Sequence, residues 1–166
     1  MRSGGWGSLA LLLLAALVLL RPWEDLDLGD EPPATASALV TRVVDGDTVE
    51  VRLGGRTEDV RYIGVDTPET VKPGAPVDCF GPQASAFNHR LVEGRRVRLV
   101  FGAERRDVYD RLLAYVYLGE RFVNAELVRR GLARTLTIPP NDRYAGQLKR
   151  LELAAARAGR GLWGAC

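Results

Sequence analysis

Residues 38–65 read ALVTRVVDGDTVEVRLGGRTEDVRYIGV, and this stretch decides the fold. It predicts three short strands, because three segments are rich in Val, Ile, Thr or Tyr. These segments are Ala38–Val44, Thr48–Leu53 and Asp59–Val65. Asp45–Gly46 and Gly54–Gly55 separate them, and such residues tolerate the positive φ of tight turns. We therefore expect an antiparallel meander.

Further strands and helices follow downstream. The segments RVRLVF, at Arg96–Phe101, and LLAYVYL, at Leu112–Leu118, predict two more strands. Helices are expected at Pro82–Gly94, Asn124–Arg130 and about Arg143–Ala158, since their apolar residues recur on one face. Five short strands with interspersed helices predict an α+β fold, a five-stranded OB-fold β-barrel with about three α-helices.

The N-terminus carries an export signal. Residues 9–20 read LALLLLAALVLL, which suits the apolar core of a signal peptide. Extended back to residue 4 the segment has 17 residues, about the minimum for a membrane span, and no small-residue cleavage site follows it directly. Residues 1–23 are thus a signal peptide or an N-terminal membrane anchor. A buried core helix is a third alternative.

The rest of the chain divides simply. Residues 24–37 are acidic and then rich in Pro and Ala, which predicts a linker, and residues 38–166 form the folded domain.

The chain is expected to be exported, and to be secreted, periplasmic or anchored at the outer face of the cell membrane. Residues 1–31 have a net charge of −3 and the whole chain +2, so the remainder has +5. A basic domain is compatible with a polyanionic partner.

Two cysteines, Cys79 and Cys166, fit an oxidising destination. We predict that they form a disulfide, and two unpaired thiols are the alternative. A two-cysteine metal site has little support, because the chain has a single histidine.

The turn Asp45-Gly46-Asp47-Thr48 holds two carboxylates one residue apart between predicted strands. Calcium takes oxygen ligands, so a carboxylate fixed on a tight turn is a suitable ligand. Asp-Gly is also the commonest hairpin turn, which is the structural alternative.

Two further segments combine arginine with carboxylates. The first contains Arg61 near the end of a strand and Asp66 and Glu69 just beyond it; a structural ion pair between Arg61 and Glu69 is the alternative. The second holds Asp107 and Arg111 before the fifth strand. Phosphodiester hydrolysis needs a divalent ion, a carboxylate that activates water, and guanidinium groups that neutralise growing phosphate charge. These residue types therefore indicate that chemistry.

Five motifs together resemble staphylococcal nuclease and its thermonuclease-like relatives, over Ala38–Trp163. They are VVDGDTVEV, RYIGVDTPET, CFGPQASAF, DVYDRLLAYVYL and FVNAELVRRGLA. The resemblance implies a calcium-dependent enzyme that accepts DNA and RNA, cleaves the 5′ P–O bond and leaves 3′-phosphates. We expect the protein to be a monomer.

The resemblance also implies roles for individual residues. Asp47 and Asp66 would bind calcium through carboxylates and Thr67 through its backbone carbonyl. Glu69 would be the general base. Asp45 would support the turn that carries Asp47 without binding the metal itself. The two arginines that would stabilise the transition state are Arg61 and Arg111.

Tyr109 matches a family tyrosine that contacts the nucleotide phosphate, but nearby positions depart from the family. Val108 replaces a lysine, Asp110 a glycine, and Thr137 a tyrosine that stacks on the nucleotide. Base preference and affinity are expected to differ, because aromatic stacking contributes about 1 to 3 kcal/mol per base. The main rival function is a non-catalytic nucleic-acid-binding module. Such modules typically lack the acid and arginine set that this chain keeps.

Overall fold

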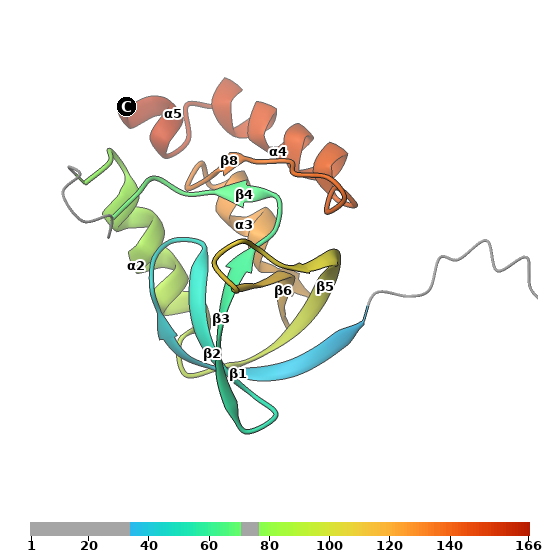
Figure 1. Ribbon diagram of the computed structural model, residues 1–166. Helices are drawn as coiled ribbons and strands as arrows, with labels where there is room; N and C mark the ends of the chain where they lie inside the picture. The colour runs from blue at the N-terminus through green and yellow to red at the C-terminus, as the bar shows by residue number, and fades with distance from the viewer. Residues whose placement is uncertain (1–33, 71–76) are drawn as a thin grey trace, which may run out of the picture. The chain divides into compact units, whose positions relative to one another are not determined.

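A computed structural model of the protein describes residues 34–70 and 77–166 (Figure 1). The predicted signal peptide or anchor at residues 1–23, with the apolar segment at 4–20, lies outside these ranges, as does most of the predicted linker. In the described part of the chain no helix is long and apolar enough to cross a membrane.

Five strands form a closed barrel, which confirms the predicted OB-type α+β fold. They are β1 (Thr35–Val43), β2 (Thr48–Leu53), β3 (Arg56–Tyr62), β5 (Arg96–Arg106) and β6 (Leu112–Leu118). Their order is β3-β2-β1-β5-β6, and a parallel pairing of β3 with β6 closes the barrel. Alternate valines and leucines, including Val40, Val60 and Leu99, are fully buried inside it. Burial of this apolar surface is the main source of stability.

Several strand boundaries differ from the prediction. β3 begins at Arg56 instead of Asp59, and β5 continues to Arg106 instead of ending at Phe101. β1 begins at Thr35, inside the stretch expected to be linker, because Thr35 to Leu39 pair with β5. β3 ends at Tyr62 instead of Val65, since the backbone turns at Gly64 with a φ of 81°. That conformation is open to glycine and costly for most other residues. Past this turn, β4 (Val65–Asp66) pairs separately with β8 (Arg134–Thr135).

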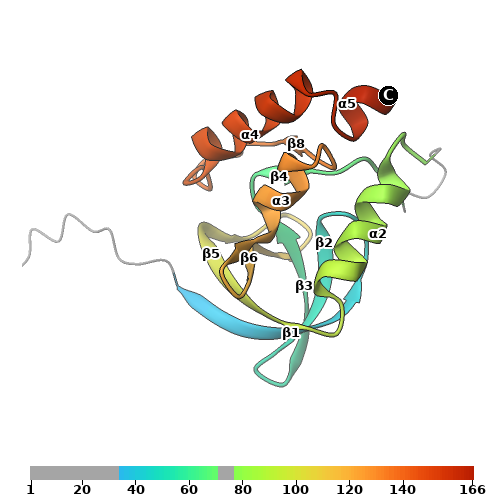
Figure 2. The ribbon, with the colours of Figure 1, turned by 180° about the vertical axis from the view of Figure 1, so that it is seen from behind.

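Three helices lie close to the predicted positions: α2 (Gly81–Val92), α3 (Val123–Arg129) and α4 (Ala145–Arg157). The two-residue strand β7 (Arg121–Phe122) precedes α3, and the short helix α5 (Leu162–Ala165) follows α4. α2 lies beside the barrel, and α4 and α5 cover the end that carries β4 and β8 (Figures 1 and 2).

Glu152 connects α4 to β8. Its carboxylate accepts hydrogen bonds from the Thr135 N–H at 2.8 Å and the Thr135 hydroxyl at 2.9 Å, and it pairs with Lys149. Burial raises the pKa of Glu152, but the hydrogen bonds from Lys149 and Thr135 outweigh burial and hold this pKa below its ordinary value of 4.5.

Glu152→Ala is expected to lower the free energy of unfolding at pH 7 by about 2 to 3 kcal/mol, because hydrogen bonds to a buried charge are lost. A depressed carboxylate pKa stabilises the fold above the ordinary pKa, and this stability is lost as pH falls through the folded-state value. The deficit should therefore shrink below pH 4.5. Urea denaturation between pH 7 and pH 3 measures it, with the exposed Glu120→Ala as control. A deficit that stays constant over this range would contradict the assignment.

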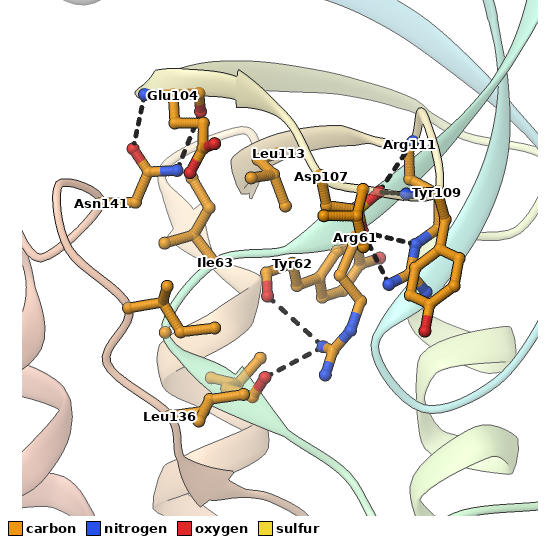
Figure 3. Close-up of a pocket in the computed structure, with 14 residues that line it drawn as sticks. Arg61, Tyr62, Ile63, Glu104, Asp107, Tyr109, Arg111, Leu113, Leu136 and Asn141 are labelled. Atoms are coloured by element: carbon orange, nitrogen blue, oxygen red, sulfur yellow. Dashed lines mark hydrogen bonds and ion pairs between the residues drawn. The ribbon is translucent and has the colours of Figure 1, made fainter.

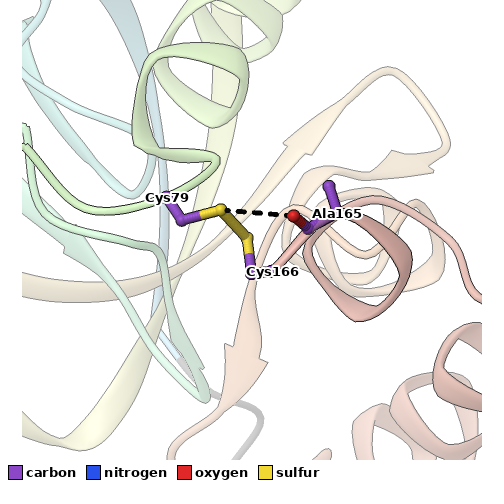
Figure 4. The surroundings of a disulfide bond; sticks show 3 residues. All are labelled: Cys79, Ala165 and Cys166. Carbon is purple, nitrogen blue, oxygen red and sulfur yellow. Dashed lines mark hydrogen bonds between the residues drawn. A yellow bond between two sulfur atoms is a disulfide. The ribbon is translucent and has the colours of Figure 1, made fainter.

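Cys79 and Cys166 form a disulfide, as predicted, with 6.1 Å between their Cα atoms (Figure 4). The bridge joins residues 87 positions apart. It therefore ties the end of the chain to the loop before α2.

Replacing both cysteines by serine should lower the free energy of unfolding by about 4 to 5 kcal/mol in the chain-entropy model, because the unfolded chain gains freedom. Thermal melts of the wild type with and without a dithiol reductant test this. The reductant should lower the melting temperature of the wild type and leave the double serine variant unchanged. Equal melting temperatures for the oxidised and reduced wild type would refute the prediction.

Candidate active site

A polar cleft of about 200 Å³ lies at the end of the barrel where the β1–β2 turn meets the segment after β4. It is lined by Asp45, Asp47, Thr48, Arg61, Asp66, Thr67, Pro68, Glu69 and Arg111. The structure thus brings together the residues for which the sequence suggested metal binding and catalysis. Tyr109 lies in an adjoining cavity.

The β1–β2 turn is held by hydrogen bonds from both sides. Asp45 Oδ1 accepts the Asp47 N–H at 2.9 Å. The fully buried Asn88, on α2, donates from Nδ2 to the Asp45 carbonyl at 3.3 Å and accepts from the Tyr62 hydroxyl at 3.2 Å. Sequence reasoning missed Asn88, whose signal is a polar residue on the inner face of a helix. The helix therefore fixes the turn that presents Asp47.

Asp47 is the most buried carboxylate of the cleft, with 4% of its surface exposed. Oδ1 lies 2.8 Å from Arg61 Nη1, while Oδ2 accepts the Thr67 N–H at 2.6 Å and the Thr67 hydroxyl at 2.9 Å. Burial and the nearby Asp45 together raise the pKa of Asp47 to about 7, although Arg61 and the hydrogen bonds from Thr67 oppose them. The charged form of the Asp47 carboxylate is thus disfavoured, and a cation bound beside it would stabilise that form.

Arg61 joins both candidate metal-binding carboxylates. Besides Asp47, it contacts Asp66 Oδ1 from Nη2 at 2.9 Å, and it donates from Nη1 to the Val65 carbonyl at 2.9 Å. Only 15% of its side chain is exposed. The guanidinium is therefore fixed beside the carboxylates with little freedom to move.

The residues present fit a hard cation with water in its shell. Across residues 34–70 and 77–166, no three His, Cys, Asp or Glu side chains converge into a complete metal cage. Asp47, Asp66 and the Thr67 carbonyl supply oxygen donors only, the ligands that calcium prefers.

Glu69 lies in the same cleft, and its backbone is held by Asp78. The Glu69 N–H donates to Asp78 Oδ2 at 3.0 Å, and the Asp78 N–H donates to the Glu69 carbonyl at 2.9 Å. Glu69 Oε1 accepts the N–H of Thr70 at 2.8 Å. The backbone that carries this carboxylate is thus held at two points.

Arg111 is oriented by Asp107, which the sequence analysis named in the same segment without giving it a separate role. Asp107 Oδ2 accepts the Nε–H of Arg111 at 2.7 Å and lies 2.7 Å from its Nη2. Asp107 Oδ1 accepts the backbone N–H groups of Tyr109 and Arg111, both at 3.0 Å. Burial raises the pKa of Asp107, but the hydrogen bonds from Arg111 and Tyr109 outweigh it and keep this pKa below the ordinary value. The carboxylate stays charged and holds the arginine.

A cavity of about 330 Å³ adjoins the polar cleft, and Arg61 and Arg111 line both (Figure 3). Its wall is mainly apolar, with Ile63, Leu113, Leu136 and Ile138. Tyr109, 77% exposed, stands at its edge, 5.3 Å from its ring centre to the Arg111 guanidinium carbon. Thr137 is exposed and is not among the lining residues. The two arginines thus mark the border between a polar and an apolar space.

Comparison with known proteins shows the family. The model of the family described as staphylococcal nuclease homologue matches residues 59–165. The chain belongs to the staphylococcal nuclease family. It is 40% identical to a thermonuclease of Staphylococcus intermedius over 92% of this chain and 94% of that protein. It is also 41% identical to a thermonuclease of Staphylococcus hyicus, over 75% of this chain and 73% of that protein.

The name of a third relative also describes it as a nuclease. Endonuclease YncB of Bacillus subtilis is 41% identical over 74% of this chain and 59% of that protein. With the two thermonucleases, this places the chain among the hydrolases that act as nucleases.

The backbone conformation at Asp110 accounts for one departure noted in the sequence. Asp110 stands where staphylococcal nuclease was expected to have glycine, and its φ is 65°. Aspartate is one of the few other residues that adopt this left-handed conformation without a large penalty. Arg106 donates to the Asp110 carbonyl at 2.6 Å, which further holds the turn.

Proposed function

We propose that the protein is an exported, calcium-dependent nuclease that hydrolyses the 5′ P–O bond of DNA or RNA and leaves 3′-phosphates. The observation that carries this proposal is the polar cleft of about 200 Å³. Its lining includes Asp47, Asp66, Glu69, Arg61 and Arg111. Two arginines beside a carboxylate-rich site match the charge that develops on phosphorus oxygens during hydrolysis.

Calcium would be held by Asp47, Asp66 and the backbone carbonyl of Thr67. When bound, it would polarise a phosphate oxygen and offset negative charge near phosphorus. Asp45 would support this site by accepting the Asp47 N–H, which keeps the turn closed.

The chain's own groups would then perform the hydrolysis. Glu69 would orient a water molecule and accept its proton as the water oxygen attacks phosphorus. Arg61 and Arg111 would donate to the phosphate oxygens, because a guanidinium fork matches their geometry and stays charged. The bond to the 5′ oxygen breaks, and that oxygen takes a proton from solvent.

The apolar cavity would hold the nucleoside next to the reacting phosphate. Tyr109 would contact the phosphate from its edge, and Ile63, Leu113 and Leu136 would face the sugar and base. Contact through these apolar side chains does not distinguish bases by hydrogen bonds, which favours broad acceptance of bases, in both DNA and RNA.

Export is supported by the disulfide, because such bonds persist in oxidising compartments. The apolar residues 9–20 would direct it, as a cleaved signal or as an anchor at residues 4–20. One chain supplies every residue of the cleft, so the proposed chemistry requires no residue from a second chain.

End-group analysis of the products tests the proposed bond cleavage. Single-stranded DNA and RNA of defined sequence are digested with calcium present, and the fragment ends are identified by mass spectrometry. Fragments with 3′-phosphates and 5′-hydroxyls are expected. Fragments with 5′-phosphates would overturn the assigned bond, and tight binding without any cleavage would favour the non-catalytic module.

A further inference from the structure

The short segment Asp78–Gly81 lies against the backbone of Glu69. Two hydrogen bonds join Asp78 to Glu69. The Glu69 N–H donates to the Asp78 carboxylate at 3.0 Å, and the Asp78 N–H donates to the Glu69 carbonyl at 2.9 Å. The Asp78 carbonyl in turn accepts the Gly81 N–H at 3.0 Å, at the start of α2. Asp78 therefore ties Glu69 to the first turn of that helix.

Gly81 packs directly against the same backbone. A Cβ atom at this position would lie 3.0 Å from the Glu69 carbonyl oxygen, 3.1 Å from the Pro68 carbonyl oxygen and 2.7 Å from Thr70 Cγ2. Only a residue without Cβ allows so close an approach. The start of α2 is thus shaped to receive the segment that carries Glu69.

Cys79 lies between these two contact points, and the disulfide connects it to Cys166, next to α5. Its partner, Cys166, directly follows α5 and donates its N–H to the Leu162 carbonyl at 3.1 Å. Leu162 is buried and donates to the Gly131 carbonyl at 2.8 Å. The segment Asp78–Gly81 is therefore fixed through the bridge to a packed part of the fold, even though Asp78 and Cys79 are exposed.

We propose that Asp78 is a positioning residue for Glu69, and that the Cys79–Cys166 disulfide holds Asp78 in place so that reduction of the bridge lowers turnover. This inference rests on the proposed role of Glu69 as the base. Reduction consumes two electrons and two protons from a dithiol and converts the S–S bond to two thiols. Cys79 then loses its link to Cys166, and Asp78 holds Glu69 less firmly.

Three variants of the full chain test the proposal. Asp78→Ala removes the acceptor for the Glu69 N–H, and Asp78→Asn keeps a carbonyl oxygen in its place. The double variant Cys79→Ser/Cys166→Ser removes the bridge without a reductant. Each is assayed for kcat and KM on single-stranded DNA below its melting temperature. Amide hydrogen exchange at Glu69 is measured by NMR.

Asp78→Ala and the double serine variant should lower kcat by between about 10- and 100-fold with KM little changed, since a misplaced catalytic group costs rate and not binding. Asp78→Asn should restore kcat. Exchange at the Glu69 amide should speed up in Asp78→Ala and in the double serine variant, and treatment of the wild type with dithiothreitol should have the same effect.

Two results would overturn the inference. One is a Glu69 amide that stays equally protected in Asp78→Ala and in the reduced protein, whatever the nuclease assay gives. The other is a kcat that the Asp78→Ala and double serine variants leave unchanged while Glu69→Gln abolishes it. If Glu69→Gln itself kept full activity, the proposed role of Glu69 would fall instead, and the exchange data would still report on the contact.

Discussion

Glu69→Gln is expected to lower kcat by about 10²- to 10⁴-fold, the usual contribution of a general base. The amide has the shape of the carboxylate but cannot accept a proton from water. Folding and calcium binding should be largely preserved, because Asp47, Asp66 and Thr67 are the proposed ligands. Initial rates on single-stranded DNA give kcat and KM, and calorimetric titration gives the calcium affinity.

Glu50→Gln is the matched control for this variant. Glu50 is a carboxylate on β2 that pairs with Arg42 and does not line the cleft, so its loss should leave kcat unchanged. A Glu69→Gln enzyme that turns over at near the wild-type rate would remove Glu69 from the mechanism.

Arg111→Ala should lower kcat by about 10²- to 10³-fold, the usual effect of removing a donor that stabilises transition-state charge. The guanidinium is held by Asp107 at 2.7 Å and lies at the border of the polar cleft and the apolar cavity. KM should change less than kcat, because the phosphate gains charge on the way to the transition state. Steady-state kinetics on a short single-stranded oligonucleotide measure both.

Arg106→Ala provides the comparison for Arg111. Arg106 lies in the same β5–β6 hairpin and pairs with Glu58 and Asp110, but it lines neither the cleft nor the cavity. Its removal should leave kcat near the wild-type value. Equal losses in the two variants would mean that the hairpin, not the Arg111 guanidinium, carries the effect.

Sequence periodicity predicted the barrel strands and the three longer helices because alternating and helical patterns report which side of an element is buried. It placed the end of β3 wrongly, since the apolar residues Ile63 and Val65 continue the strand pattern past the turn at Gly64. It also missed the first residues of β1. Pairing of Thr35 with Val100 in β5 is a long-range contact that local composition does not encode.

The candidate site could likewise be predicted only in part from the sequence. The motif residues Asp47, Arg61 and Glu69 could be proposed from the sequence, because their types match the chemistry and the family. The bonding partners of Asn88 and Asp78 could not be, since each acts through a hydrogen bond to the backbone of a residue in another segment. Such partners become visible only when the fold places them.

The most direct test of the central claim is hydrolysis of single-stranded DNA by the purified protein, with calcium and with a calcium chelator, for the wild type and Arg61→Ala. Arg56→Ala, an exposed arginine on the same strand, is the control. We predict cleavage by the wild type and Arg56→Ala only when calcium is present, and almost none by Arg61→Ala. Cleavage that continues in the chelator, or that does not need Arg61, would contradict the proposed site.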